Sequence, residues 1–229
     1  MFVIVKKKAV IAVVLCLTVM SVALTACFTA SASVSPSFDK VIVLDAGHGG
    51  VDGGVVGSSG IKESELNLKI VKELEKELKR MNYGVVLTRT GDEALAGGKK
   101  ADMQARKKVI DEANADMVVS IHINKFSDAR RRGVQVFYDD TKRWTAQGMY
   151  MQNVMNEFVN KKYAKRDNLS ALGGDYFIVK CSNVPSIIIE CGFISNSEDQ
   201  KLLTSREYRE YLAKYIAIGI DSLLSDGSR

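Results

Sequence analysis

Short apolar runs alternate with longer segments of helical periodicity along most of this 229-residue chain. The run at 41–44 is continuously apolar, as expected of a strand buried on both faces. Between 63 and 81, apolar residues recur at three- and four-residue steps and predict an amphipathic helix. The pattern predicts further strands at 85–88, 117–123, 134–138, 177–179 and 186–189, and further helices at 101–113, 144–159 and about 208–223. This alternation predicts one α/β domain with a mostly parallel or mixed central sheet and helices on both faces.

The first part of the chain has a different pattern. Lys6, Lys7 and Lys8 precede an apolar stretch at 9–24, and no acidic residue occurs before Asp39. A positive segment followed by an apolar one is typical of an export signal. We therefore interpret residues 1–27 as a signal peptide, lipoprotein signal or membrane anchor, 28–37 as a flexible linker, and 38–229 as the folded domain.

Three fates of this leader are compatible with the sequence. Residues 24–27 (Leu-Thr-Ala-Cys) resemble a bacterial lipobox, in which Cys27 would carry the lipid. The small residues at 30–32 offer a simpler cleavage site. About twenty apolar residues also just suffice to span a bilayer without cleavage. Each alternative exports the domain, either secreted or held at the membrane.

Charge and cysteine content exclude some functions. The formal net charge is +5, and loss of the three leader lysines lowers it to +2. Nucleic-acid binding needs a concentrated basic face, and the only tight cluster is Arg130–Arg131–Arg132, so we expect no nucleic-acid partner. Cys181 and Cys191 are too few for a disulfide framework and can either pair or remain free thiols.

The only two histidines follow strand-like runs. His48 lies in Asp-Ala-Gly-His-Gly-Gly after the first run, and His122 lies in Ser-Ile-His-Ile-Asn at the end of another. Ligand sites in α/β proteins lie at the carboxyl ends of strands. Neutral imidazole is the commonest protein ligand for metals such as zinc. A lone histidine is more often a hydrogen-bonded structural residue, but the pair in this setting predicts a metal site at the strand carboxyl ends.

A catalytic zinc ion typically has three protein ligands, so the site needs a further donor. Glu63 is the best candidate, because it opens the helix at 63–81 after a glycine-rich loop. Asn67, four residues later on the same helix face, can hold Glu63 by a hydrogen bond. The alternative is a first-turn acid favoured by the helix dipole. Glu65 is a rival ligand but points to another face.

Glu190 follows the apolar run at 186–189 directly. A partly desolvated carboxyl group has a raised pKa and suits general acid–base catalysis, although a lone glutamate at this position is more often a loop or capping acid. Asp45 can orient His48 through its distal ring nitrogen or simply end the strand. The glycine-rich loop lacks the Gly-Lys-Ser/Thr sequence of a phosphate-binding loop.

These motifs, in this order, resemble those of one family. The chain resembles the zinc-dependent N-acetylmuramoyl-L-alanine amidases of the Amidase_3 type from about residue 41 to the C-terminal helix, and is most like the CwlD-type spore-cortex enzymes. The motifs lie at 45–50, 62–63, 66–68, 88–89, 106, 120–124 and 190–193. The resemblance implies Zn²⁺ held by His48, Glu63 and His122, catalysis by Glu190, and cleavage of the amide between the lactyl group of N-acetylmuramic acid and L-alanine in peptidoglycan.

The subfamily resemblance implies a role in the spore cortex, where a deacetylase then completes muramic-δ-lactam. Because no wall-binding repeat is visible, we expect an accessory protein or the membrane anchor to position the enzyme. Asn124 and Arg89 are candidate substrate-side or supporting groups. Two alternatives remain open at this point: a zinc peptidase that cuts within the stem peptide, and a catalytically silent glycan-binding wall protein.

Overall fold

The computed structural model describes residues 38–141, 143–163 and 168–226. The predicted export signal and linker, at 1–37, lie outside the described residues and remain predictions. The strands are β1 (Val41–Ala46), β2 (Gly84–Leu87), β3 (Met117–Asn124), β4 (Gln135–Asp139), β5 (Leu172–Gly174) and β6 (Ser186–Phe193). The helices are α2 (Glu63–Arg80), α3 (Lys99–Glu112), α4 (Thr145–Val154), its π-helical continuation η1 (Met155–Asn160), α5 (Phe177–Lys180), α6 (Ser197–Thr204) and α7 (Arg206–Asp226).

The strands form one sheet in the order β2-β1-β3-β6-β4-β5. The first four in this order run parallel, β4 is antiparallel to β6, and β5 is parallel to β4. This mixed sheet confirms the predicted fold class. Because β1, β3 and β6 are parallel neighbours, the residues that follow or end these strands gather at one edge of the sheet.

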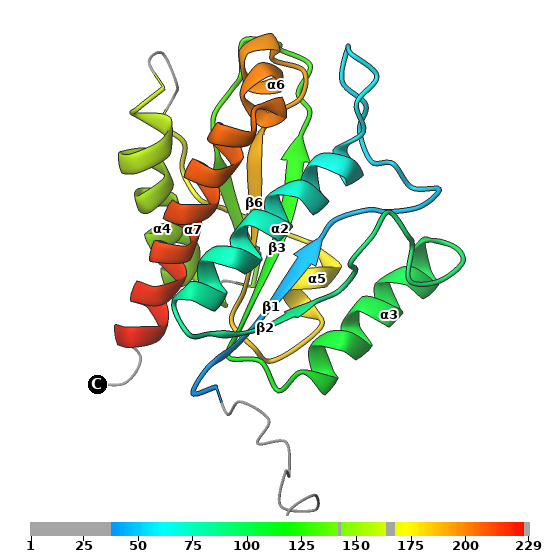
Figure 1. The fold of residues 1–229 in the computed structure, drawn as a ribbon, viewed down its shortest axis with the longest axis vertical. Helices are drawn as coiled ribbons and strands as arrows, with labels where there is room; N and C mark the ends of the chain where they lie inside the picture. The colour runs from blue at the N-terminus through cyan, green and yellow to red at the C-terminus, as the bar shows by residue number, and fades with distance from the viewer. Residues whose placement is uncertain (1–37, 142, 164–167, 227–229) are drawn as a thin grey trace, which may run out of the picture. The chain divides into compact units, whose positions relative to one another are not determined.

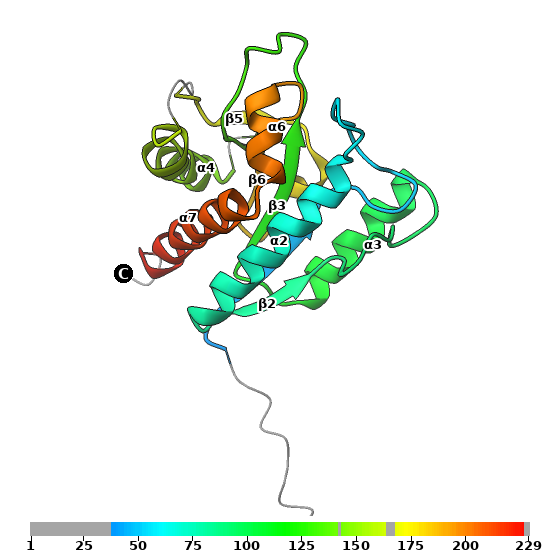
Figure 2. The ribbon, with the colours of Figure 1, turned by 45° about the horizontal axis from the view of Figure 1, so that its top comes forward.

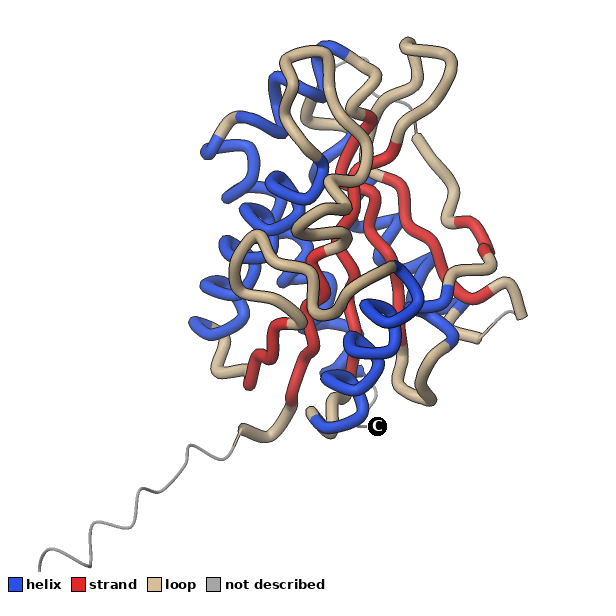
Figure 3. Tube along the Cα trace, turned by 90° about the vertical axis from the view of Figure 1, so that its right-hand side faces the viewer, coloured by secondary structure: helices blue, strands red, loops and turns tan. Residues whose placement is uncertain are grey.

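Helices cover both faces of the sheet. Ile42 and Leu44 of β1 belong to a large core cluster under α2, α4 and α7, whereas Val43 belongs to a smaller cluster with Ile110 of α3. Successive strand residues point to opposite faces, so a continuously apolar strand buries side chains on both. Figures 1 and 2 show α2 beside α7, with α3 apart from them, and Figure 3 shows the strands between helices on either side.

Helix α2 positions Glu63, the candidate carboxylate ligand, at its first residue. Its apolar stripe, spaced at three and four residues, is fully buried against the sheet and α7. Burying each such side chain contributes roughly 1.5–3 kcal/mol, which anchors the helix along its length. The stripe consists of Leu66, Ile70, Leu74 and Leu78. The first residue of α2, Glu63, is therefore held in a fixed position at the strand ends.

Three local predictions were wrong or incomplete. Residues 177–179 form not a strand but the short helix α5, because a brief apolar run fits a buried helical turn equally well. Strand β5 was not predicted, because its two glycines carry no side chain to pack and it is held by pairing with β4. Helix α6 was also missed, although Asn196 caps it by accepting bonds from the amides of Glu198 and Asp199.

No helix within the described part of the chain is both long and apolar enough to cross a membrane.

Candidate metal centre and active-site cleft

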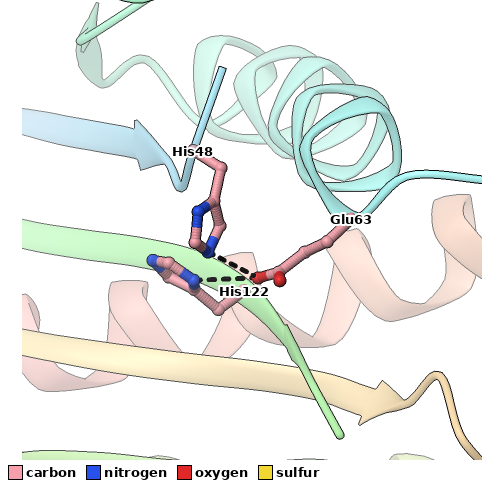
Figure 4. Close-up of side chains that lie close together, drawn as sticks. All are labelled: His48, Glu63 and His122. Atoms are coloured by element: carbon pink, nitrogen blue, oxygen red, sulfur yellow. Dashed lines mark hydrogen bonds and ion pairs between the residues drawn. The ribbon is translucent and has the colours of Figure 1, made fainter. Parts of the chain in front are cut away.

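Three side chains from separate segments converge at the carboxyl edge of the sheet. His48 follows β1, Glu63 begins α2 and His122 lies in β3 (Figure 4). His122 Nδ1 is 3.0 Å and His48 Nε2 is 3.3 Å from Oε1 of Glu63. One donor atom from each residue lies within 4.8 Å of the other two. Two imidazoles and a carboxylate at this spacing can hold a divalent cation such as zinc.

The backbone around His48 is shaped for this arrangement. His48 has a φ of 60°, in the left-handed region that non-glycine residues adopt rarely and often at functional sites. Gly47 lies directly against the imidazole of His122, and a Cβ added at Gly47 would sit 2.2 Å from its Cε1. Glycine is therefore required at 47 for the two histidines to approach each other.

Further hydrogen bonds orient the candidate metal ligands His48 and Glu63. Oδ2 of Asp52 lies 2.9 Å from Nδ1 of His48, which leaves Nε2 directed at the cluster. Nδ2 of Asn67 donates to Glu63 Oε1 at 3.3 Å and to the carbonyl of Gly47 at 3.1 Å. The amides of Val55 and Ile123 also donate to the Glu63 carboxylate. Such outer contacts fix ring and carboxylate orientation in metal sites.

Asp45 does not orient His48, contrary to one of the two roles considered for it. Its buried carboxylate accepts hydrogen bonds from Thr88, Ser120 and Arg106. Asp45 instead meets Arg106 of α3. The residue that contacts the Nδ1 of His48 is Asp52, four residues after His48 in the glycine-rich loop. Sequence reasoning missed Asp52, although an acid four residues after a candidate ligand was an available signal.

Arg106 links α3 to the loop that carries His48. It is 1% exposed and forms ion pairs with Asp45 at 2.6 Å and Asp102 at 2.7 Å. It also donates to the carbonyl of Ala46 at 2.8 Å and to that of His48 at 2.7 Å. This buried guanidinium thus holds the unusual backbone at His48 through direct hydrogen bonds.

The cluster is strongly coupled electrostatically. Burial acts to raise the pKa of Glu63, but hydrogen bonds with His122 and His48 outweigh it and hold that pKa far below the ordinary value. Burial acts to lower the pKa of His48, yet its contacts with Glu63 and Asp52 raise that pKa to about 9. The pKa of His122 is likewise raised, against burial, by Glu63 and Glu190. A site that attracts protons this strongly is also favourable for a cation.

Glu190 lies beside this cluster, in register with His122 on the neighbouring strand. Its Oε2 is buried and has no hydrogen-bond partner among the described residues. Burial is the main effect on its pKa, and it raises that pKa to about 7 despite attraction from His122. An unpartnered buried carboxylate oxygen is costly unless water, substrate or metal completes it. The donor set and this oxygen together fit a catalytic zinc ion with its water.

The centre opens into a cleft of about 720 Å³ on the α3 and α5 side of the sheet. Its lining includes His48, His122 and Glu190, together with Lys99 at the start of α3 and Tyr176 just before α5. This volume lies in the usual range for a small-molecule or peptide site.

The two candidate substrate-side residues, Arg89 and Asn124, form hydrogen bonds with the backbone. Arg89 is 2% exposed and donates to backbone carbonyls, including those of Ala46, Gly47 and Ser64. Asn124 ends β3 beyond a register shift, and its Oδ1 accepts from the next amide.

The two domain cysteines, Cys181 and Cys191, are free thiols.

Comparison with known proteins identifies the family of this chain. Residues 42–222 match the Amidase_3 family model, described as N-acetylmuramoyl-L-alanine amidase. The solved CwlD amidase from Clostridioides difficile, in complex with the GerS lipoprotein, is 34% identical, covers 82% of this chain and 99% of its own, and superposes with a TM-score of 0.75. The germination-specific N-acetylmuramoyl-L-alanine amidase of Bacillus subtilis is 28% identical over 81% of this chain and 80% of its own length.

Amidase AmiA of Escherichia coli is 27% identical over 80% of this chain and 75% of its own length. The family match spans most of the folded domain, and the solved relative shares its architecture. The chain belongs to the Amidase_3 family and is an N-acetylmuramoyl-L-alanine amidase acting on peptidoglycan.

Proposed function

We propose that His48, Glu63 and His122 bind Zn²⁺ and that Glu190 is the general base for hydrolysis of the amide between the lactyl group of N-acetylmuramic acid and L-alanine. The observation that carries the proposal is the convergence of these three donors beside the unpartnered buried oxygen of Glu190. Three protein ligands leave a position for water, as in zinc hydrolases.

Zinc held by these three residues would polarise the scissile carbonyl and lower the pKa of a bound water to about 7. Glu190 accepts a proton from the attacking water as oxygen adds to the lactyl carbonyl carbon. Glu190 then delivers that proton to the nitrogen of L-alanine as the C–N bond breaks. The products are a lactyl carboxyl group and a free L-alanine amine. A pKa of about 7 suits a group that must both take and return a proton near neutral pH.

The first test is mass spectrometry of muropeptides after incubating the zinc-loaded protein with purified peptidoglycan. Wild type should release stem peptides that begin with L-alanine, whereas Glu190→Gln should retain zinc and release none. Glu65→Gln is the matched control, because this glutamate also lies in the first turn of α2 but outside the cluster. Undiminished activity of Glu190→Gln with normal zinc would overturn the assignment of the base. Products cut within the stem peptide would instead indicate a peptidase.

We further propose that the enzyme is exported and acts in the spore cortex, where removal of the peptide precedes muramic-δ-lactam formation by a deacetylase. The similarity to the CwlD amidase and to the germination-specific amidase supports this role. Deletion of the gene from a spore-forming host should remove muramic-δ-lactam from cortex muropeptides. Unchanged lactam content would contradict the cortex role while leaving the amidase reaction intact.

An accessory protein, or an N-terminal anchor or lipid at the membrane, would position the enzyme on its substrate. The solved CwlD relative is in complex with a lipoprotein, which supports a partner of that kind. Zinc content and hydrolysis of intact cortex peptidoglycan should both be compared with and without a co-expressed lipoprotein partner. Full activity of the purified domain alone would contradict the need for one.

A further inference from the structure

Most charged side chains that line the cleft have a charged partner. Asp45 and Asp102 are paired with Arg106, Asp52 contacts His48, and Asp175 is paired with Lys180. Two charged residues of the cleft lining remain. One is Glu190, the proposed base, and the other is Lys99, which has no carboxylate within 4.0 Å among the described residues.

Lys99 lies in the lining of the same cleft as His48, His122 and Glu190. It is the first residue of α3, follows Gly98 with a φ of 86°, and lines the cleft. Burial acts to raise the pKa of Asp52, but its hydrogen bond with His48 lowers that pKa, and attraction to the ammonium of Lys99 adds a smaller lowering effect. Lys100, the next residue, is also exposed but does not line the cleft. Of these two adjacent exposed lysines, therefore, only Lys99 lines the cleft.

An exposed ammonium that has no carboxylate partner in the cleft is suited to an anionic group of the substrate. Near the scissile amide, the glycan side carries no charge. The peptide side does, because the residue after L-alanine in stem peptides is a glutamate linked through its side chain, which leaves its α-carboxyl free or amidated. That group lies about two residues, or roughly 7 Å, from the cleaved nitrogen.

We propose that Lys99 binds this α-carboxylate of the second stem residue, so that the peptide lies in the cleft between the start of α3 and the segment before α5. The proposal rests on the amidase reaction proposed above. It makes Lys99 a specificity-determining residue that distinguishes free glutamate from its amidated form.

The test compares two soluble muropeptides that differ only in carrying a carboxylate or a carboxamide at this position. Values of kcat/KM are measured for zinc-loaded wild type, Lys99→Ala, Lys99→Arg and, as the matched control, Lys100→Ala. Affinities for both ligands are measured by calorimetry with Glu190→Gln alone and with Lys99→Ala added, which gives a readout independent of turnover.

We expect wild type and Lys100→Ala to prefer the carboxylate by roughly three- to tenfold, the size of one charge-assisted contact at a partly exposed site. The preference should fall to about one in Lys99→Ala and return in Lys99→Arg, and the affinities should follow the same pattern. An equal preference in wild type and Lys99→Ala overturns the proposal, as does no preference in wild type. Cleavage at another bond, or neither binding nor cleavage, overturns the amidase reaction and this inference together.

Discussion

Replacing Arg106 by methionine tests whether the buried ion-pair network supports the active-site loop. The side chain is 1% exposed, and its two ion pairs and two carbonyl contacts are all 2.6–2.8 Å long. Methionine keeps much of the volume but leaves the 2%-exposed Asp45 without its cation. Removing one partner of a buried pair costs about 3–5 kcal/mol, because the other charge stays desolvated. That is a large share of the 5–15 kcal/mol that stabilises a typical domain.

The assay is urea unfolding at pH 7, with Arg130→Met as the control because that guanidinium is 91% exposed. We expect the control to change the free energy of unfolding by less than about 0.5 kcal/mol. Adding Asp45→Asn to Arg106→Met should cost less than the sum of the single changes, because the two groups interact directly. A loss below about 1 kcal/mol for Arg106→Met, or strict additivity with Asp45→Asn, would refute the reasoning.

The same variant has a pH signature. In wild type, burial acts to raise the pKa of Asp45, but Arg106 and Ser120 outweigh it and lower that pKa below 3.8. The stability this provides is present above pH 3.8 and is lost as pH falls through the folded-state pKa. Without Arg106, burial dominates and raises the pKa of Asp45, so protonation favours the folded state. The deficit of Arg106→Met relative to wild type should therefore shrink as the solution is acidified.

Three further outcomes follow from the centre itself. Asp52→Ala should weaken zinc binding by about 10- to 100-fold, measured by competition with a chelator, because His48 loses the contact that orients its ring; unchanged affinity would contradict that role. Gly47→Ala should lower zinc content measured by elemental analysis, since the added Cβ overlaps the ring of His122, and a fully loaded variant would show that the loop can shift. The kcat should fall tenfold per unit of pH below an apparent pKa at or under about 7, because Glu190 must be unprotonated to act as base and a bound cation lowers its pKa further; a kcat that rises on acidification would exclude it.

Much of the fold could be predicted because its signals are local. The continuous apolar run of β1 and the three- and four-residue spacing of α2 are direct consequences of burial on two faces and on one stripe. Helix α5 was predicted as a strand and β5 was missed, because a three- or four-residue segment carries too little periodicity. Their conformations depend on what packs against them, namely the second core cluster and β4.

The amino-acid sequence by itself was enough to predict which residues carry the chemistry. Two histidines and two glutamates at the ends of predicted elements, in the order of a known family's motifs, were sufficient to single out His48, Glu63, His122 and Glu190. Their types and positions relative to strand ends are local properties that a linear pattern retains.

Only the tertiary structure decided how these residues are supported. The contact of Asp52 with His48, the ion pair between Asp45 and Arg106, and the position of Lys99 in the cleft depend on which strands are neighbours and which face each helix covers. Asp45 and Arg106 are 61 residues apart, yet their charged groups meet at 2.6 Å. No local periodicity specifies such a pairing, because it results from the packing of α3 against the sheet as the whole core forms.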